Sequence, residues 1–188
     1  MPLAIAPEGA ANGHSELVSP LASGAAQIGF WAMEDLVEAG REEDVSIVPI
    51  GIQYYYVDEP WERVESLIYE LEQECGLTTE ANLRMWHIRI VENFIAVTDS
   101  YVKDRPTLDR FAEITLLLWD LVAQIKGERS AKPPRIGNRR VQMTICNPLP
   151  LSDYWDRYQS GDRQARQATI DLTQELQTSM EGTLDRGW

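Results

Sequence analysis

The chain has 188 residues, enough for one domain with a sizeable core. Hydrophobic residues make up 44% and charged residues 25%, which excludes the sparse-apolar, highly charged composition of a disordered chain. The formal net charge of -13 excludes a broad nucleic-acid interface, because a phosphate backbone would be repelled. It also disfavours anionic lipid headgroups, so any membrane contact is expected to depend on apolar side chains or local basic spots.

The first apolar run, residues 3–6, ends at a Pro-Glu-Gly turn and predicts a buried strand that enters a loop. A domain seldom begins with a core strand, so we expect the chain to start inside a longer domain and to leave this strand as an exposed sheet edge. Helical spacing over 21–39, closed by Gly40, predicts a helix, and the β-branched run 45–57 predicts a strand covered on both faces. This order implies a right-handed crossover and a parallel pair of strands.

Three amphipathic helices are predicted next. The first follows Pro60 and ends at Gly76, the second ends before Pro106, and the third follows Thr107. A basic, proline-rich linker at 127–134 closes the third helix. We expect these helices to form a hairpin or small bundle inserted into the sheet domain.

Strand character returns at 141–145, a turn is predicted at 147–150, and a final helical region starts at Ser152 or Asp153. The pattern therefore predicts an α/β fold: a mixed, mainly parallel sheet flanked by helices, with an α-helical insertion. The predicted parts are a core with an acceptor loop at 1–57, a helical insertion at 58–134, and a strand and helix completing the core at 135–188.

Common catalytic signatures are absent, and the sequence has two histidines. His87 precedes Glu92 by five residues, which points the two side chains to different sides of a helix and favours an ordinary surface histidine. His14 lies in a loop near Glu8 and Glu16, and is the better candidate for a site residue.

Four segments, in order along the chain, resemble the PlsC-like glycerophospholipid acyltransferase family. They are Ala6-Pro7-Glu8-Gly9, Gly24-Ala25-Ala26, Val48-Pro49-Ile50-Gly51 and Asn147-Pro148-Leu149-Pro150. Structural alternatives stay open for two of them. Glu8 could simply accept backbone hydrogen bonds in a loop, and Pro49 could interrupt a strand at a sheet edge or bulge.

The resemblance implies an O-acyltransferase of phospholipid synthesis. In such enzymes a histidine takes the proton of a glycerol hydroxyl, which attacks the thioester of acyl-CoA or acyl carrier protein. The acceptor would be a lysophospholipid or glycerol phosphate, with substrate-binding roles for Glu8, Gly9, Asn12 and His14 and with no metal or cofactor. This interpretation requires the Glu8 loop and the strand near Val45 to lie side by side around one pocket.

The sequence departs from the family in two ways. No histidine is followed at the family's spacing by aspartate, so no catalytic residue is named and this fragment is expected to be inactive alone. The arginine expected after Pro-Glu-Gly is also missing, which leaves Asn12 and His14 as possible hydrogen-bonding substitutes toward a phosphate.

Two further functions stay open: a non-catalytic lipid- or acyl-carrier-binding module, and a helical interaction protein. The aromatic cluster of residues 54–56 with Trp61 could line an acyl-chain groove or pack in a core. Cys75 and Cys146 lack metal or redox spacing and are expected to be reduced. With no signal peptide and no apolar run of about 20 residues, we expect a cytoplasmic protein, with peripheral contact at the inner membrane face left open.

Overall fold

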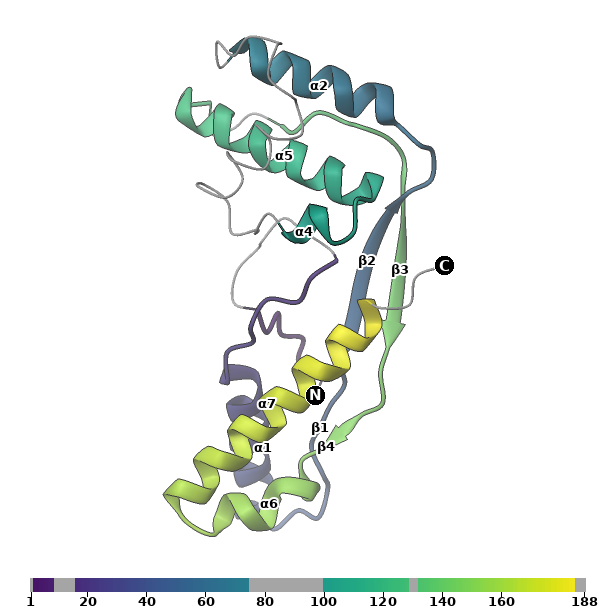
Figure 1. Ribbon diagram of the computed structural model, residues 1–188. Coiled ribbons are helices and arrows are strands. Elements are labelled where there is room, and N and C mark those ends of the chain that lie inside the picture. Colours follow the sequence, from purple (N-terminus) through teal and green to yellow (C-terminus); the bar gives the residue numbers. More distant parts are fainter. Residues whose placement is uncertain (1, 9–15, 75–99, 129–131, 185–188) are drawn as a thin grey trace. The chain divides into compact units, whose positions relative to one another are not determined.

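The structure is a computed structural model that describes residues 2–8, 16–74, 100–128 and 132–184 (Figure 1). The chain forms two compact units. The first unit holds the described residues within 2–8, 16–53 and 142–184, and the second holds those within 54–74, 100–128 and 132–141. The second unit therefore includes the described part of the predicted insertion together with residues 54–57 and 135–141 of its flanks, and the first unit includes the rest of the described flanks.

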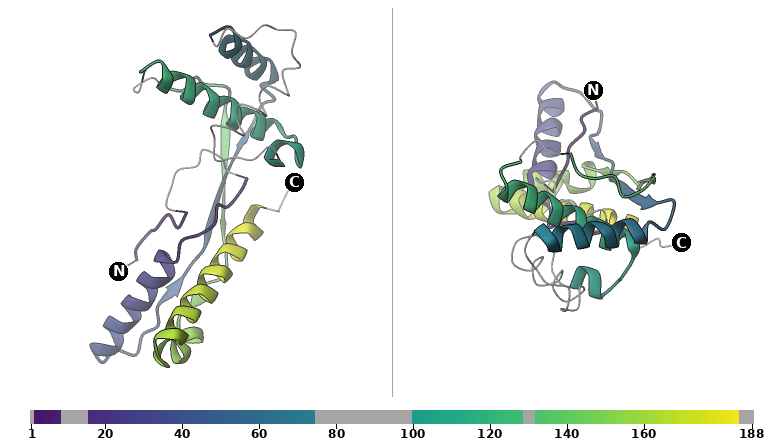
Figure 2. Two further views of the ribbon diagram at one scale, coloured as in Figure 1. Left: turned by 60° about the vertical axis from the view of Figure 1, so that its left-hand side comes forward. Right: turned by 90° about the horizontal axis from the view of Figure 1, so that it is seen from above.

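Three helices build the first unit: α1 (Gly24–Glu38), α6 (Ser152–Gln159) and α7 (Asp162–Leu184). Figure 2 shows α1 and α7, which pack against each other. Ala168, Leu172 and Leu176 are each at most 3% exposed, so the predicted four-residue spacing on the last helix is confirmed. The buried core residues are Ala26, Phe30, Met33, Leu149, Leu151, Tyr154, Ala168, Leu172 and Leu176.

The end of α1 shows why the sequence stops the helix where it does. Gly40 has a φ of 69°, a conformation that costs glycine little because it has no Cβ. Its N–H donates to the carbonyl of Val37 at 3.0 Å, and the N–H of Arg41 donates to the carbonyl of Leu36 at 3.0 Å. These two bonds form a Schellman motif, so the predicted role of Gly40 is confirmed.

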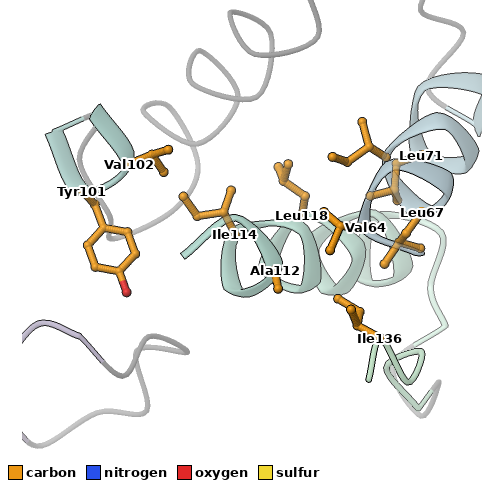
Figure 3. Packing of buried hydrophobic residues seen from close by; sticks show 10 residues of the cluster. Val64, Leu67, Leu71, Tyr101, Val102, Ala112, Ile114, Leu118 and Ile136 are labelled. Atoms are coloured by element: carbon orange, nitrogen blue, oxygen red, sulfur yellow. The ribbon is translucent and has the colours of Figure 1, made fainter. Parts of the chain in front are cut away.

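The second unit contains α2 (Trp61–Glu74), α4 (Ser100–Lys103) and α5 (Leu108–Ile125). The Thr107 hydroxyl caps α5 by accepting the N–H of Arg110 at 3.4 Å. Side chains of α2 and α5 face one another across the core (Figure 3). The buried core residues are Val64, Leu67, Ile68, Leu71, Tyr101, Val102, Ala112, Ile114, Leu118 and Ile136. The long second helix predicted in this region falls mostly on residues 75–99, outside the described part.

Among the described residues, four strands form two sheets of two strands each: β1 (Ser46–Ile47) with β4 (Leu149–Pro150), and β2 (Ile50–Tyr56) with β3 (Arg139–Ile145). Both pairs are antiparallel. At one end of the β2–β3 pair the N–H of Val57 donates to the Asn138 carbonyl at 2.9 Å, and at the other the N–H of Cys146 donates to the Pro49 carbonyl at 3.0 Å. These bonds set the register, in which Ile50 lies opposite Ile145 and Ile52 lies opposite Met143.

The predicted turn at 147–150 is replaced by a break of three residues, 146–148, between β3 and β4. Ile47 pairs with Leu149, whereas Pro49 pairs with Cys146. Val48 therefore lies opposite two residues, Asn147 and Pro148, which is the arrangement of a β-bulge. A bulge suits this place because proline has no N–H to give to the ladder.

The predicted mainly parallel sheet is also wrong. Helices hold 55% of the described residues, and the sheets found there are two small antiparallel pairs. Residues 3–6, expected to be the first strand, form no strand, and Leu3 is 67% and Ile5 43% exposed. A short apolar run does not specify a strand unless neighbouring strands are there to pair with it. Without this first strand the expected parallel crossover is lost, and β1 and β2 pair with segments from the end of the chain instead.

Candidate functional site

Of the predicted substrate-binding residues, the structure describes Glu8. Its half-buried carboxylate accepts the backbone N–H of Ser19 at 3.1 Å. This contact is the backbone hydrogen bond that was left open for Glu8, and it does not test a role in binding. Gly9, Asn12 and His14 lie outside the described residues.

The other segments of the acyltransferase resemblance all belong to the first unit. Gly24 is the first residue of α1, and Pro49 separates β1 from β2. Beyond Ser19, which Glu8 contacts, the chain continues to Leu21, whose N–H donates to the side chain of Gln177 on α7 at 3.3 Å. Strand β2 instead contacts α7 at Thr183, which lies against Gly51.

The segment after Ser19 and the strand therefore contact different sides of α7. Gln177 and Thr183 are six residues apart, which separates their side chains by about 120° around a helix. The shared pocket that the acyltransferase interpretation requires gains no support from these contacts.

A groove of about 560 Å³ runs along α7 in the first unit. Its lining residues are Leu21, Ser23, Ile170, Thr173, Gln174, Gln177, Thr178 and Glu181. The Gln177 amide also donates to Glu181 at 2.8 Å. Because this lining combines hydroxyls, amides and a carboxylate without a lysine or arginine, it suits an uncharged hydroxylated group better than a phosphate.

One face of the β2–β3 pair carries exposed apolar side chains within the first unit. Ile50 is 44% exposed, Ile52 46%, Met143 60% and Ile145 67%. We call these four residues the ribbon face. The register places them as two adjacent cross-strand pairs, so their exposed surfaces lie together.

The opposite face of β2 is covered by α7. Gly51 and Gln53 are buried there, and a Cβ placed on Gly51 would lie 2.0 Å from the Thr183 hydroxyl. The strand therefore buries its glycine and its glutamine and exposes its isoleucines. The prediction that this strand is covered on both faces is wrong.

Sequence reasoning missed the ribbon face, although β3 contained a signal for it. Apolar Val141, Met143 and Ile145 alternate with polar Gln142 and Thr144, the period-two pattern of a strand with two unlike faces. That pattern alone predicts that the apolar side is buried. Only the packing of α7 on the other side shows that it is not.

The aromatic cluster of residues 54–56 with Trp61 lies in the second unit, where some of its side chains pack against the core and others are exposed. Trp61 contacts Phe111 edge-to-face, with ring centroids 5.7 Å apart, and Tyr56 packs against the same core. Burial raises the pKa of Tyr56, and the carboxylates of Asp109 and Glu113 add to this rise against the opposing Arg139 guanidinium. Packing therefore accounts for Trp61 and Tyr56.

The remaining candidates give no catalytic group in the described part of the chain. His87 and Glu92 lie outside it, as does Cys75. Cys146 is a free thiol that donates to the Ser179 carbonyl at 3.4 Å. Among the described residues no cluster of histidine, cysteine and carboxylate side chains could hold a metal ion.

Two observations bear on identity and location. None of the helices that the structure describes is both long and apolar enough to cross a bilayer. Comparisons with protein-family models, with curated proteins and with solved structures found no match to this chain. The acyltransferase resemblance therefore still depends on the sequence segments alone.

Proposed function

We propose that this protein binds lipid, as the lipid-contacting part of a cytoplasmic acyltransferase-family protein of phospholipid synthesis. The reaction would be the one the resemblance implies, acyl transfer from acyl-CoA or acyl carrier protein to a lysophospholipid or glycerol-phosphate acceptor. The observation that carries the lipid-binding part is the ribbon face. The described chain supplies binding, and we do not assign it the catalytic base.

The ribbon face suits an apolar ligand because of its composition. Four large aliphatic side chains, each at least 44% exposed, occupy two adjacent cross-strand pairs without a charged residue among them. Contiguous exposed apolar surface of this kind on a folded protein commonly marks a binding site. Covering these side chains would remove their apolar area from water, which favours binding by roughly 25 cal/mol per Å².

The charge of the chain favours an uncharged occupant over a second copy. Two copies would each carry a net charge of -13, and the four residues of the ribbon face include no cation that would offset the repulsion between their surfaces. A fatty acyl chain meets no such repulsion. We therefore assign the ribbon face to the acyl chain of a lipid.

The groove along α7 is a second candidate contact, for the glycerol moiety of an acceptor. Its hydroxyl and amide groups can hydrogen-bond to a glycerol moiety, and it offers no cation to a phosphate. Deprotonation of the glycerol hydroxyl needs a general base, and the sequence lacks the family's histidine–aspartate pair. Lipid binding without thioester consumption is the behaviour expected of this chain.

The proposal is tested by titrating the chain with lysophosphatidylcholine below its micelle-forming concentration, using calorimetry. Ile52→Gln should weaken binding about fivefold, since it removes on the order of 1 kcal/mol of apolar burial. Ile28→Gln is the matched control, because Ile28 is exposed at 37% on α1 of the same unit and outside the ribbon face. Equal affinities for wild type and Ile52→Gln would refute the assignment.

Two further measurements separate the alternatives. Sedimentation that shows a dimer in wild type and a monomer in Ile52→Gln would assign the ribbon face to a second copy and overturn the lipid proposal. An acyl-CoA assay with lysophosphatidate as acceptor should show no thioester consumption above background. Consumption would show that this chain contains a catalytic base and would contradict its non-catalytic role.

A further inference from the structure

Basic residues are concentrated in one stretch of this acidic chain. Residues 126–140 contain six of its 17 lysines and arginines but only one of its 30 carboxylates. Besides Lys126, the structure describes four basic residues of this stretch, all in the second unit: Lys132, Arg135, Arg139 and Arg140. Positive charge is therefore concentrated in one segment of a chain whose net charge is -13.

Arg139 is held against two tyrosine rings. Its guanidinium carbon lies 5.5 Å from the ring centroid of Tyr54 and 5.8 Å from that of Tyr56. A cation–π contact is made through the charge of the guanidinium and does not use its N–H groups as hydrogen-bond donors, so they can still bind an anion. Within the described part of the chain Arg139 forms no ion pair that would occupy those donors.

Apolar surface lies next to this guanidinium. The β2–β3 register places Val141 opposite Tyr54 and Arg139 opposite Tyr56, on one side of the strands. Val141 is 56% and Tyr54 42% exposed. We call Tyr54, Tyr56, Arg139 and Val141 the arginine face.

The combination of chemical groups on the arginine face is characteristic of a membrane–water interface. Tyrosine presents an apolar ring with a polar tip, and arginine carries an apolar stem below its charge, so both suit the headgroup level of a bilayer. Asp109 approaches from α5, but its carboxylate accepts the N–H of Tyr56 at 2.8 Å, at the edge of β2. The cations on the neighbouring stretch, Lys132 and Arg135, add to the attraction for anionic headgroups.

We propose that the arginine face docks on an anionic bilayer surface, with Arg139 meeting lipid phosphate groups and Lys132 and Arg135 strengthening the attraction. This inference rests on the proposed lipid function and adds a charged group of residues on the same pair of strands to it. The net negative charge does not prevent such docking, because screening limits its reach to about 8 Å at physiological ionic strength. At contact, the local cations therefore decide the sign of the interaction.

Sedimentation with vesicles tests this docking. At about 0.15 M salt the full chain should bind vesicles that mix phosphatidylglycerol with phosphatidylcholine, and should release them at about 1 M salt. Arg139→Gln should weaken binding about fivefold, the effect of one basic residue near a charged membrane. Arg163→Gln is the matched control, since Arg163 is exposed on α7 in the first unit, and it should bind like wild type.

A conservative variant distinguishes membrane docking from a discrete phosphate site. Arg139→Lys keeps the charge but not the planar fork, so it should bind anionic vesicles within about twofold of wild type if the bilayer charge is what is recognised. Tight binding of free glycerol 3-phosphate that Arg139→Lys abolishes would overturn bilayer docking in favour of a phosphate pocket. Binding of a single-stranded oligonucleotide in preference to the anionic vesicles would overturn it in favour of nucleic acid.

The two proposals can fail independently. Lysophosphatidylcholine has no net charge, so its binding reports on the ribbon face and should be unchanged in Arg139→Gln. If Arg139→Gln binds phosphatidylglycerol vesicles as wild type does, the docking proposal fails while the lipid-binding function stands. If Ile52→Gln leaves lysophosphatidylcholine binding unchanged, the proposed function fails, and Arg139-dependent vesicle binding is still decided by its own assay.

Discussion

Replacing Gly51 by alanine tests the packing that turns the ribbon face outward. A Cβ at this position would lie 2.0 Å from the Thr183 hydroxyl oxygen, 2.6 Å from the Thr183 Cβ and 3.0 Å from its methyl group. Thr183 is 2% exposed, and its hydroxyl donates to the Met180 carbonyl at 2.7 Å, so it has little room to turn away. The added methyl group must therefore push the end of α7 away from β2.

The expected cost of Gly51→Ala is about 1–3 kcal/mol, the usual range for inserting a methyl group into a packed interface. It should appear as a lower urea midpoint followed by circular dichroism, and as faster hydrogen exchange in the last turns of α7. Gly182→Ala is the matched control. Gly182 lies in α7, and a methyl group added there would meet no atom within 4 Å, so alanine should stabilise the helix by about 0.5–1 kcal/mol.

A Gly51→Ala variant that is as stable as wild type and exchanges at the same rate in α7 would refute this packing. That result would mean that α7 does not cover this side of β2. The outward placement of Ile50 and Ile52 would then lose its structural basis, and the ribbon face would lose its support.

Three other predictions concern stability. Thr107→Ala removes the cap of α5 and should lower the free energy of unfolding by about 1 kcal/mol, with Thr107→Ser close to wild type; equal urea midpoints for all three would contradict the cap. Gly127 has a φ of 82°, so Gly127→Ala should cost about 1 kcal/mol in the same assay, and a neutral result would show that the turn after α5 relaxes. Burial and the Glu175 carboxylate, which accepts the Tyr154 hydroxyl, raise the pKa of Tyr154. The folded state therefore holds this proton more tightly than the unfolded chain: its stability contribution is complete below the ordinary pKa of about 10 and is lost as the pH rises through the raised value. Tyr154→Phe should lose less stability above that pH than wild type does, and identical pH profiles would contradict the linkage.

Local signals in the sequence located several helix boundaries. Gly40 and Gly127 end α1 and α5 because glycine adopts the left-handed conformation that closes a helix. Thr107 begins α5 because its hydroxyl replaces a missing backbone acceptor. The apolar spacing of the last helix likewise identified its buried face. Each of these features depends on residues within a few positions of one another, so the sequence alone could reveal it.

Only part of the candidate site could be predicted from the sequence. The sequence singled out Glu8 by resemblance, and the structure gives its carboxylate a contact with Ser19 that is 11 residues away. The ribbon face and the arginine face were not predicted. Their residues come from strands more than 80 positions apart, and no local pattern says which segments will pair.

By itself, the sequence determined where helices begin and end, which sides of them are apolar, and how unevenly the positive charge is distributed. The tertiary structure alone decided the strand partners, their antiparallel direction and the side of β2 that faces solvent. The physical reason is that pairing and burial depend on contacts between distant segments. A small residue such as Gly51 lets α7 approach one side of the strand, and the isoleucines on the other side are exposed as a result.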